Sequence, residues 1–231
     1  MGGSEVRLAK LADVSQMSEV FAYGFVDDDV FGRWMHPGRH EHPEDWFRWW
    51  HVEVRKHVLD PVARCFVRTN EEGIIMGCML MKRVGEGAKA LGGAESYADM
   101  LVRKMYDADE YADSFTGTNR SADPKALEAF EQNWNEIEHH FTGPRAESWM
   151  IELLCIHPNA QKSGYGKALI EAAIAVARSE EPPLPLAVIA SEVGDAFYEK
   201  IGFREIGRAN VGAMSEVEGG SLKFYEQHLK T

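Results

Sequence analysis

The stretch Gln161-Lys162-Ser163-Gly164-Tyr165-Gly166 decides the fold, because it separates two segments of opposite character. Before it, the short apolar run 148–156 (SWMIELLCI) is closed by His157-Pro158, a pattern that predicts a buried strand. After it, apolar residues recur at helical spacing: Ala168, Leu169, Ala172, Ala173 and Val176. The sequence therefore predicts a strand, a glycine-bearing turn and a helix.

A turn of this kind directs several backbone N–H groups, and the positive end of the helix dipole, toward one point beyond the strand. Glycine suits the turn because a side chain would block a ligand and because it accepts positive φ. The chemistry that this favours is binding of a phosphate or pyrophosphate. Two familiar phosphate loops are excluded, since Gln161 replaces the first Walker glycine and Leu169 replaces the third glycine of the dinucleotide fingerprint.

The strand 154–156 followed by Gln161-x-x-Gly164-x-Gly166 resembles the signature of the GNAT superfamily of acetyl-CoA-dependent acetyltransferases. A second segment resembles the family in the same order: the apolar run 186–190, then Ser191-Glu192-Val193-Gly194, then 197–203 (FYEKIGF). The resemblance is close over residues 148–207 and looser toward the N-terminus. It implies an α/β fold with a mixed, mostly antiparallel central sheet flanked by helices.

The resemblance also implies that acetyl-CoA is the acyl donor. Backbone N–H groups of the loop are expected to hold its pyrophosphate, with the pantetheine arm along the preceding strand. The residues expected to bind the cofactor are Leu154, Cys155, Ile156, Gln161, Lys162, Ser163, Gly164, Tyr165, Gly166, Lys167 and Ser191. In the family that strand carries a bulge and splays from the next strand, but the sequence gives no direct sign of a bulge. No metal is expected.

Two residues are the candidate catalytic groups. Tyr198 stands where many relatives place a tyrosine that protonates the departing thiolate; the alternative is that it only packs against the cofactor. An amine of pKa ~10 is mostly protonated at neutral pH, so a base helps, and several relatives place a carboxylate where Glu152 stands. Alternation does not decide which face Glu152 occupies. His157 is the second candidate base, and Cys155 as a nucleophile is less favoured than either.

The expected reaction is direct attack by an amine on the thioester within a ternary complex. Two alternatives remain open at this point. One is a catalytically silent module that binds coenzyme A or regulates a partner. The other is a transferase of a different acyl group, or one that modifies a protein instead of a small molecule.

Composition limits the partners. The 231 residues, 45% hydrophobic and 27% charged, are typical of one globular domain (1–231), and no apolar run approaches the ~20 residues that span a bilayer. The net charge of −12 argues against nucleic-acid binding and favours a cationic amine, which is expected to be a small molecule. Cys65, Cys78 and Cys155 are widely spaced on expected strands, which favours reduced thiols and a cytoplasmic location.

The N-terminal region is expected to form the acceptor side of the site. A strand is predicted at 6–9, and Asp13 with Gln16 resembles the capping box of a helix. Asp27-Asp28-Asp29 is interpreted as a loop or helix start in preference to a metal site. Phe25, Phe31 and Trp34 are assigned to core packing in preference to the acceptor site, and the aromatic cluster 46–50 of a helix over 43–58 to a packing face. The nearby histidines 36, 40, 42, 51 and 57 are interpreted as surface residues and not as a zinc site.

A hairpin is predicted from 61–68 and 74–82. Between Arg83 and Arg145 the chain then departs from a minimal acetyltransferase, and we interpret residues 83–146 as a helical insertion. Its start, 84–93, is glycine-rich and is predicted to be mobile. Helices are predicted over 96–109 and over 125–141, the second with an apolar face that either covers the acceptor site as a lid or pads the sheet edge.

Overall fold

The computed structural model describes residues 5–93, 95–96, 100–106 and 119–230. Its strands are β1 (Val6–Leu8), β2 (Ala63–Thr69), β3 (Ile75–Val84), β4 (Ser148–Ile156), β5 (Leu186–Ala190), β6 (Arg204–Arg208) and β7 (Ser221–Tyr225). Its helices are α1 (Val14–Gly24), α2 (Pro43–Leu59), α3 (Glu86–Gly93), α5 (Pro124–Gln132), α6 (Trp134–Ile137), α7 (Tyr165–Ser179) and α8 (Asp195–Ile201). A π-helical segment, η2 (Asp29–Met35), joins α1 to α2.

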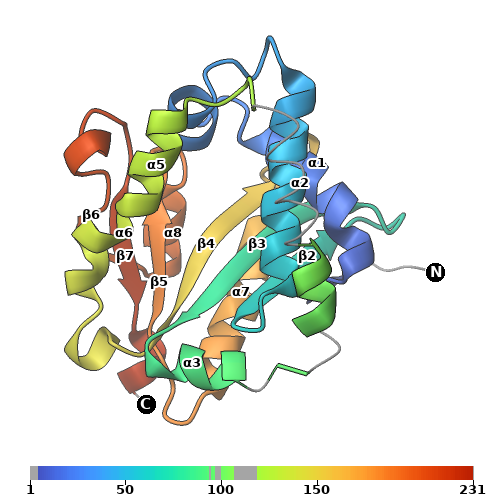
Figure 1. Cartoon of the computed structure of the whole chain (residues 1–231). Coiled ribbons are helices and arrows are strands. Elements are labelled where there is room, and N and C mark those ends of the chain that lie inside the picture. Colours follow the sequence, from blue (N-terminus) through green and yellow to red (C-terminus); the bar gives the residue numbers. More distant parts are fainter. Residues whose placement is uncertain (1–4, 94, 97–99, 107–118, 231) are drawn as a thin grey trace.

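The strands form one seven-stranded sheet in the order β1-β2-β3-β4-β5-β7-β6. Neighbouring strands are antiparallel, except for β4 and β5, which are parallel. Helices α1 and α2 cover one face of the sheet, and α7 and α8 cover the other (Figure 1). The predicted mixed, mostly antiparallel sheet flanked by helices is therefore confirmed, and the predicted first strand, the hairpin, the helix over 43–58 and the helix after the glycine turn are present.

β4 contains one extra residue in its ladder with β3. Leu80 pairs with Leu153 and Met81 pairs with Ile151, which leaves Glu152 without a partner. An extra residue of this kind is a β-bulge, and it reverses the faces of the side chains that follow. Trp149 and Ile151 accordingly pack on the α7 side, whereas Leu153 and Cys155 pack on the α1–α2 side.

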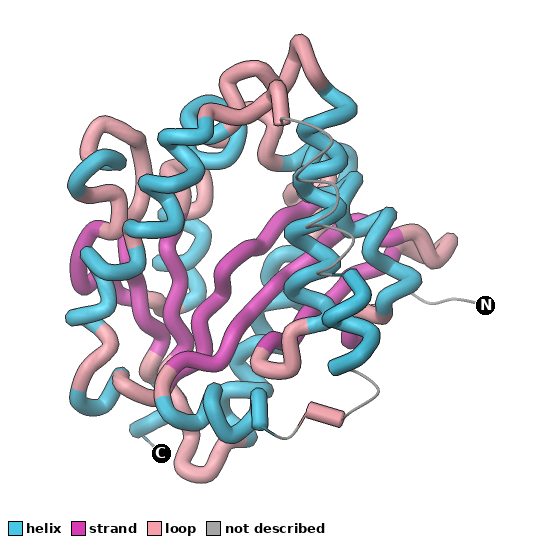
Figure 2. Tube along the Cα trace, viewed as in Figure 1, coloured by secondary structure: helices cyan, strands magenta, loops and turns pink. Residues whose placement is uncertain are grey.

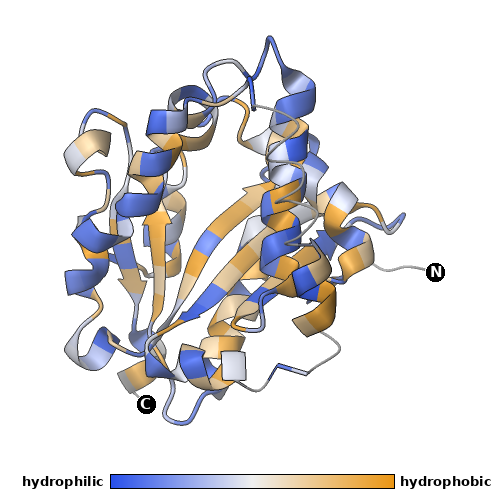
Figure 3. Cartoon of the chain, in the orientation of Figure 1, coloured by the Kyte–Doolittle hydropathy of each residue, from blue (hydrophilic) through white to orange (hydrophobic). Residues whose placement is uncertain are grey.

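The bulge is also where β4 parts from β5. Their parallel pairing extends from Trp149↔Leu186 to Ile151↔Val188 and goes no further, although both strands continue. The two strands diverge beyond this point and leave an opening in the sheet (Figure 2). A short hydrophilic segment interrupts the otherwise hydrophobic β4 beside this opening (Figure 3).

The predicted long helix over 125–141 is wrong as a single helix. α5 ends at Gln132, a short α6 follows, and residues 138–140 form a 3₁₀ turn. The side-chain amide of Asn133 donates to the carbonyl of Ala209 (3.0 Å), which ties the chain down between the two pieces. The apolar face is therefore divided: Phe130 of α5 contacts Phe31 of η2, while Ile137 is buried and Phe141 packs on Phe224 of β7.

Three further predictions need correction or restriction. The glycine-rich start of the insertion is helical (α3), because the Glu147 carboxylate accepts from the N–H groups of Glu86 and Gly87 at its first turn. Asp13 and Gln16 form no capping box: Asp13 accepts from the Lys10 N–H, and Gln16 accepts from the Ile75 N–H. Of the helix predicted over 96–109, residues 100–106 are helical and residues 97–99 and 107–109 lie outside the described residues.

Trp46 ties α2 to α1, and a substitution there tests how much this contact stabilises the fold. Its side chain is 2% exposed, and its indole N–H donates to the Ala22 carbonyl (3.1 Å). We expect Trp46→Phe to lower the free energy of unfolding by about 1–3 kcal/mol, since a buried carbonyl loses its donor and a gap remains. Urea denaturation measures this change. Val193→Ala, at a side chain 93% exposed, should change stability by less than about 0.5 kcal/mol.

Candidate active site

A cavity of about 780 Å³ occupies the opening between β4 and β5 and continues between α2, η2 and α5. Its floor consists of residues from the two diverging strands: Met150 to Leu154 from β4, and Val188 to Ser191 from the end of β5. The cavity therefore owes its position to the bulge. Of the residues predicted for the site, Glu152, Leu154, Ser191 and Tyr198 line it.

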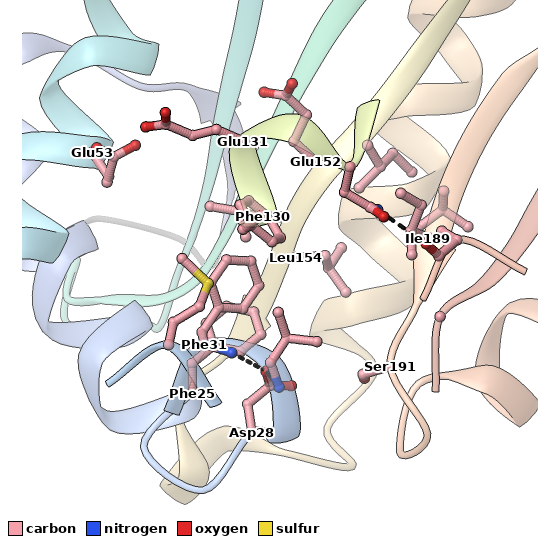
Figure 4. Close-up of a pocket in the computed structure, with 18 of the residues that line it drawn as sticks. Phe25, Asp28, Phe31, Glu53, Phe130, Glu131, Glu152, Leu154, Ile189 and Ser191 are labelled. Atoms are coloured by element: carbon pink, nitrogen blue, oxygen red, sulfur yellow. Dashed lines mark hydrogen bonds between the residues drawn. The ribbon is translucent and has the colours of Figure 1, made fainter. Parts of the chain in front are cut away.

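One wall of the cavity is aromatic. Phe25 and Phe31 of the α1–α2 connection lie against Trp50 (ring centroids 5.3 and 5.5 Å), and Phe31 also contacts Phe130 of α5 (5.5 Å). All four line the cavity together with Trp49, and Figure 4 shows Phe25, Phe31 and Phe130 on neighbouring walls. Phe25 and Phe31 thus both pack in the core and line the site.

Residues of the expected insertion (83–146) form part of the cavity wall. Leu127, Phe130 and Glu131 of α5 line it, and Glu131 points across the cleft toward Glu53 of α2 (Figure 4). Trp34, the third aromatic residue proposed for this region, is not among the lining residues. Of the two roles considered for the insertion, α5 has the position of a cover over the cavity, whereas Phe141 packs on β7 at the sheet.

The expectation that the nearby histidines are surface residues is wrong for His36, which is fully buried behind this wall. Its ring lies against Trp46 and Trp49 (centroids 4.8 and 4.4 Å), and its Nδ1 is 2.9 Å from the Phe31 carbonyl. Burial lowers the pKa of His36 to about 4, so the ring is neutral at pH 7 and Nδ1–H donates. His36 therefore holds η2, and with it Phe31, against α2.

Asp28 begins η2 at the edge of the cavity. One of its carboxylate oxygens accepts from the N–H groups of Val30 and Phe31 (3.0 and 2.8 Å), and burial raises the pKa of the acid. Asp29 pairs with Arg33 one turn later. The interpretation of 27–29 as a helix start is therefore confirmed. Within the described residues there is no group of three or more His, Cys, Asp or Glu side chains that suits a metal ion.

Glu152 projects from the bulge toward α2 and contacts His57, a second histidine that the sequence placed on the surface. His57 Nε2 lies 2.8 Å from Glu152 Oε2, and His57 Nδ1 lies 2.8 Å from the Glu53 carbonyl. Burial lowers the pKa of His57, but the hydrogen bond and charge of Glu152 raise it by more. Sequence reasoning missed this pair because the two residues are 95 positions apart.

Tyr198 enters the cavity from the other side of the opening, on α8. Its side chain is 5% exposed and packs against Phe203 and Phe197. Burial raises the pKa of its hydroxyl, so Tyr198 keeps its proton at neutral pH. Ser191, at the end of β5, accepts from the N–H of Gly194 (3.3 Å) just before this helix.

The loop 161–167 lies outside the cavity and is mostly exposed. Two left-handed positions shape it, since φ is +62° at Lys162 and +85° at Gly164, the residue before α7. A Cβ on Gly164 would meet no atom within 4 Å, so this glycine is needed for its backbone angle and not for space. Phe197 connects the two regions, because it lines the cavity and lies 3.2 Å from where a Cβ of Gly166 would stand.

Cys155 faces away from the cavity. Its thiol is buried against α1 and donates to the Val20 carbonyl (3.4 Å), and burial raises its pKa. The bulge causes this orientation, because it directs the side chain of Cys155 to the α1–α2 face of the sheet. The side chains of Leu154 and Ile156 pack toward α7 on the other face. Cys155 can contribute only its backbone to the opening. All three cysteines are free and buried, as predicted.

The diverging parallel strands, the glycine turn at the start of α7 and the tyrosine on α8 are the features that the resemblance to the GNAT superfamily implies. Comparison supports this directly: residues 140–215 match the family model described as "Acetyltransferase (GNAT) domain". Over these residues the chain is therefore similar to GNAT acetyltransferases.

Known proteins resemble the whole chain at low identity. An acetyltransferase of Stachybotrys chartarum is 23% identical over 221 residues, which cover 94% of this chain and 87% of that protein. A structure described as histone acetyltransferase HPA2 and related acetyltransferase, from Corynebacterium glutamicum, matches with a TM-score of 0.60 at 16% identity, covering 96% and 94% of the two chains. The PaiA N-acetyltransferase of Thermoplasma acidophilum, solved with coenzyme A, matches with a TM-score of 0.50 at 12% identity and covers 95% and 96%.

Among the residues that the structure describes, no helix combines the length and the apolar character that crossing a membrane requires.

The buried His36 leads to a pH prediction. Its ordinary pKa is 6.5 and its folded value is about 4, so between these values the unfolded chain binds a proton that the folded chain does not. Stability should therefore fall as the pH falls through this window, by about 3 kcal/mol from pH 7 to pH 4 for this one group. His36→Asn, which keeps a donor for Phe31 but does not titrate, should show a correspondingly smaller decrease in urea denaturation. An equal pH dependence in both proteins would contradict the assignment.

Proposed function

We propose that this protein transfers an acetyl group from acetyl-CoA to a primary amine of a small molecule, by direct attack in a ternary complex. The observation that carries the proposal is the opening between β4 and β5, with Glu152 on one side and Tyr198 on the other. A carboxylate that takes a proton and a phenol that gives one therefore face a common space. This is the pair of groups that acyl transfer to an ammonium needs.

The residues around the opening fit acetyl-CoA. Beyond Ile151 the edge of β4 is released from β5, so backbone groups there are available to an extended pantetheine arm. The exposed loop ahead of α7 supplies N–H groups that have no partner within the helix, beside the positive end of its dipole. When bound, acetyl-CoA supplies the thioester whose acetyl group is transferred.

The protein groups then act in a simple order. Glu152 accepts a proton from the ammonium, so that the neutral amine can attack the thioester carbonyl. Tyr198 donates its proton to the leaving thiolate, and its raised pKa means that it still holds that proton at neutral pH. Cys155 forms no acyl intermediate in this scheme, because its thiol faces α1. Proximity within the cavity supplies much of the rate enhancement.

The cavity favours a small acceptor with an apolar body. Its volume of about 780 Å³ suits a small molecule, and its aromatic wall suits an apolar or aromatic group. The basic side chains that line it are Arg48, Lys56 and His57, and they are outnumbered by the five carboxylates of Asp28, Asp45, Glu53, Glu131 and Glu152, which favours an ammonium. α5 closes the cavity from above, so the insertion is proposed to act as a cover that limits the size of the acceptor.

The loop can be tested with a matched pair of substitutions. Asn and Asp both tolerate the left-handed angle at Gly164 and have the same size, but only Asp adds a negative charge. We expect Gly164→Asp to bind acetyl-CoA at least ~10-fold more weakly than Gly164→Asn, because the charge repels the pyrophosphate. Isothermal titration calorimetry measures both dissociation constants. Equal affinities would place the pyrophosphate elsewhere, and no binding by folded wild type would sink the acetyltransferase proposal.

Tyr198→Phe tests the proton donor. The ring and its packing against Phe203 remain, so acetyl-CoA affinity should be unchanged within ~2-fold while kcat for amine acetylation falls by ~10–100-fold. Steady-state kinetics on a panel of arylalkyl and alkyl amines, with calorimetry for the cofactor, separates these effects. An unchanged kcat would show that Tyr198 only packs against the cofactor.

A further inference from the structure

We infer that His57 is a positioning residue that joins Glu152 in a two-group base, so that the proton taken from the acceptor is shared across the pair. The inference deepens the proposed function and rests on it. It starts from the 2.8 Å contact between Nε2 of His57 on α2 and Oε2 of Glu152 at the bulge.

The hydrogen bonds of His57 fix where its protons lie. Nδ1 faces the backbone carbonyl of Glu53, which can only accept, so Nδ1 carries a proton. Nε2 faces an oxygen of Glu152, and an ionised carboxylate also only accepts. The short contact therefore requires one further proton between Nε2 and Oε2. The favoured state of the pair is an imidazolium beside a carboxylate.

Removal of that shared proton leaves a lone pair of Nε2 facing a charged oxygen at hydrogen-bond distance. This state is repulsive, so Nε2 of His57 takes a proton back more readily than an imidazole that faces no carboxylate does. The proton at Nε2 is therefore held by both groups. The upward direction of the His57 pKa agrees with this geometry.

The other charges around the pair are largely matched. On α2, Nζ of Lys56 lies 3.1 Å from Oε1 of Glu53. Nζ of Lys82 on β3 lies 2.8 Å from Oδ2 of Asp60, which follows α2. Cys65 of β2 is buried, and Glu152 contributes to the increase in its pKa. Glu131 of α5 faces the pair from across the cavity. Of these neighbours, Glu53 and Glu131 favour the protonated pair, and Lys56 and Lys82 oppose it.

The reactive form of the pair is the deprotonated one, with neutral His57 and ionised Glu152, and it exists in equilibrium with the favoured protonated form. The acceptor ammonium gives one proton to the free oxygen of Glu152, and rotation of the carboxyl group then places the protonated oxygen against Nε2 of His57, where the proton is shared. The amine nitrogen keeps its electron pair for attack. A proton acceptor that includes an imidazole suits this transfer better than a lone carboxylate, whose ordinary pKa is ~4.

Nuclear magnetic resonance titration of the imidazole nitrogens tests the pair without any turnover. In the wild type His57 should titrate above pH 6.5, and in Glu152→Gln its pKa should fall by ~1 unit or more, because the charge that holds the proton is gone. His51→Gln, an exposed position on the same helix, is the matched control and should leave the His57 titration unchanged. A His57 that titrates alike in wild type and Glu152→Gln overturns the inference.

The pH profile of kcat/KM tests the role in catalysis. Wild type should lose activity as the pH falls through the pKa of the pair. His57→Gln keeps an amide donor for Glu152 but does not titrate, so its acid limb should move ~1 pH unit or more lower, and its plateau should fall by ~10-fold. A lower plateau of kcat/KM with the acid limb at the same pH as in wild type would mean that His57 has only a structural role. If the wild-type protein binds acetyl-CoA but acetylates no amine, the proposed function and the catalytic role of the pair are both overturned. In that case the titration of the imidazole nitrogens still decides whether His57 and Glu152 share a proton.

Discussion

The single extra residue in β4 is the constraint on which the rest of the site depends. Side chains alternate along a strand with a period of two, so one inserted residue exchanges the faces of all that follow. At Glu152 this exchange sends the carboxylate toward α2 and turns Cys155 toward α1. The same position ends the pairing of β4 with β5. The opening, the carboxylate that faces it and the unreactive thiol beneath it thus share one cause.

The two ends of the proposed reaction site differ in their electrostatics. At the cofactor end, an exposed loop presents backbone N–H groups, and these act locally in a chain with a net charge of −12. At the acceptor end, carboxylates lie among aromatic rings in a partly enclosed space. A polyanionic cofactor and a cationic acceptor are each matched by their own end. The negative charge of the whole chain therefore favours the acceptor, while the start of α7 has to offset it for the cofactor.

The acceptor end is built from contacts between distant segments. His36 is held neutral between Trp46 and Trp49 and fixes η2 by its bond to Phe31. Phe31 in turn contacts Phe130 of the insertion. α5 is thereby in direct contact with the aromatic wall of the cavity, although the two segments are about a hundred residues apart in the sequence.

The sequence by itself determined the local features: the strand, the left-handed turn at Gly164 and α7, the position of Tyr198 on α8, and the reduced cysteines. These follow from periodicity and from the backbone freedom of glycine, which act over a few residues. Only the tertiary structure decided the face of Glu152, its partner His57, the burial of His36 and the break at Asn133. Each of these depends on a contact between segments far apart in the chain, and neither an unpaired residue in a ladder nor a hydrogen bond across 95 positions leaves a periodic trace in the sequence.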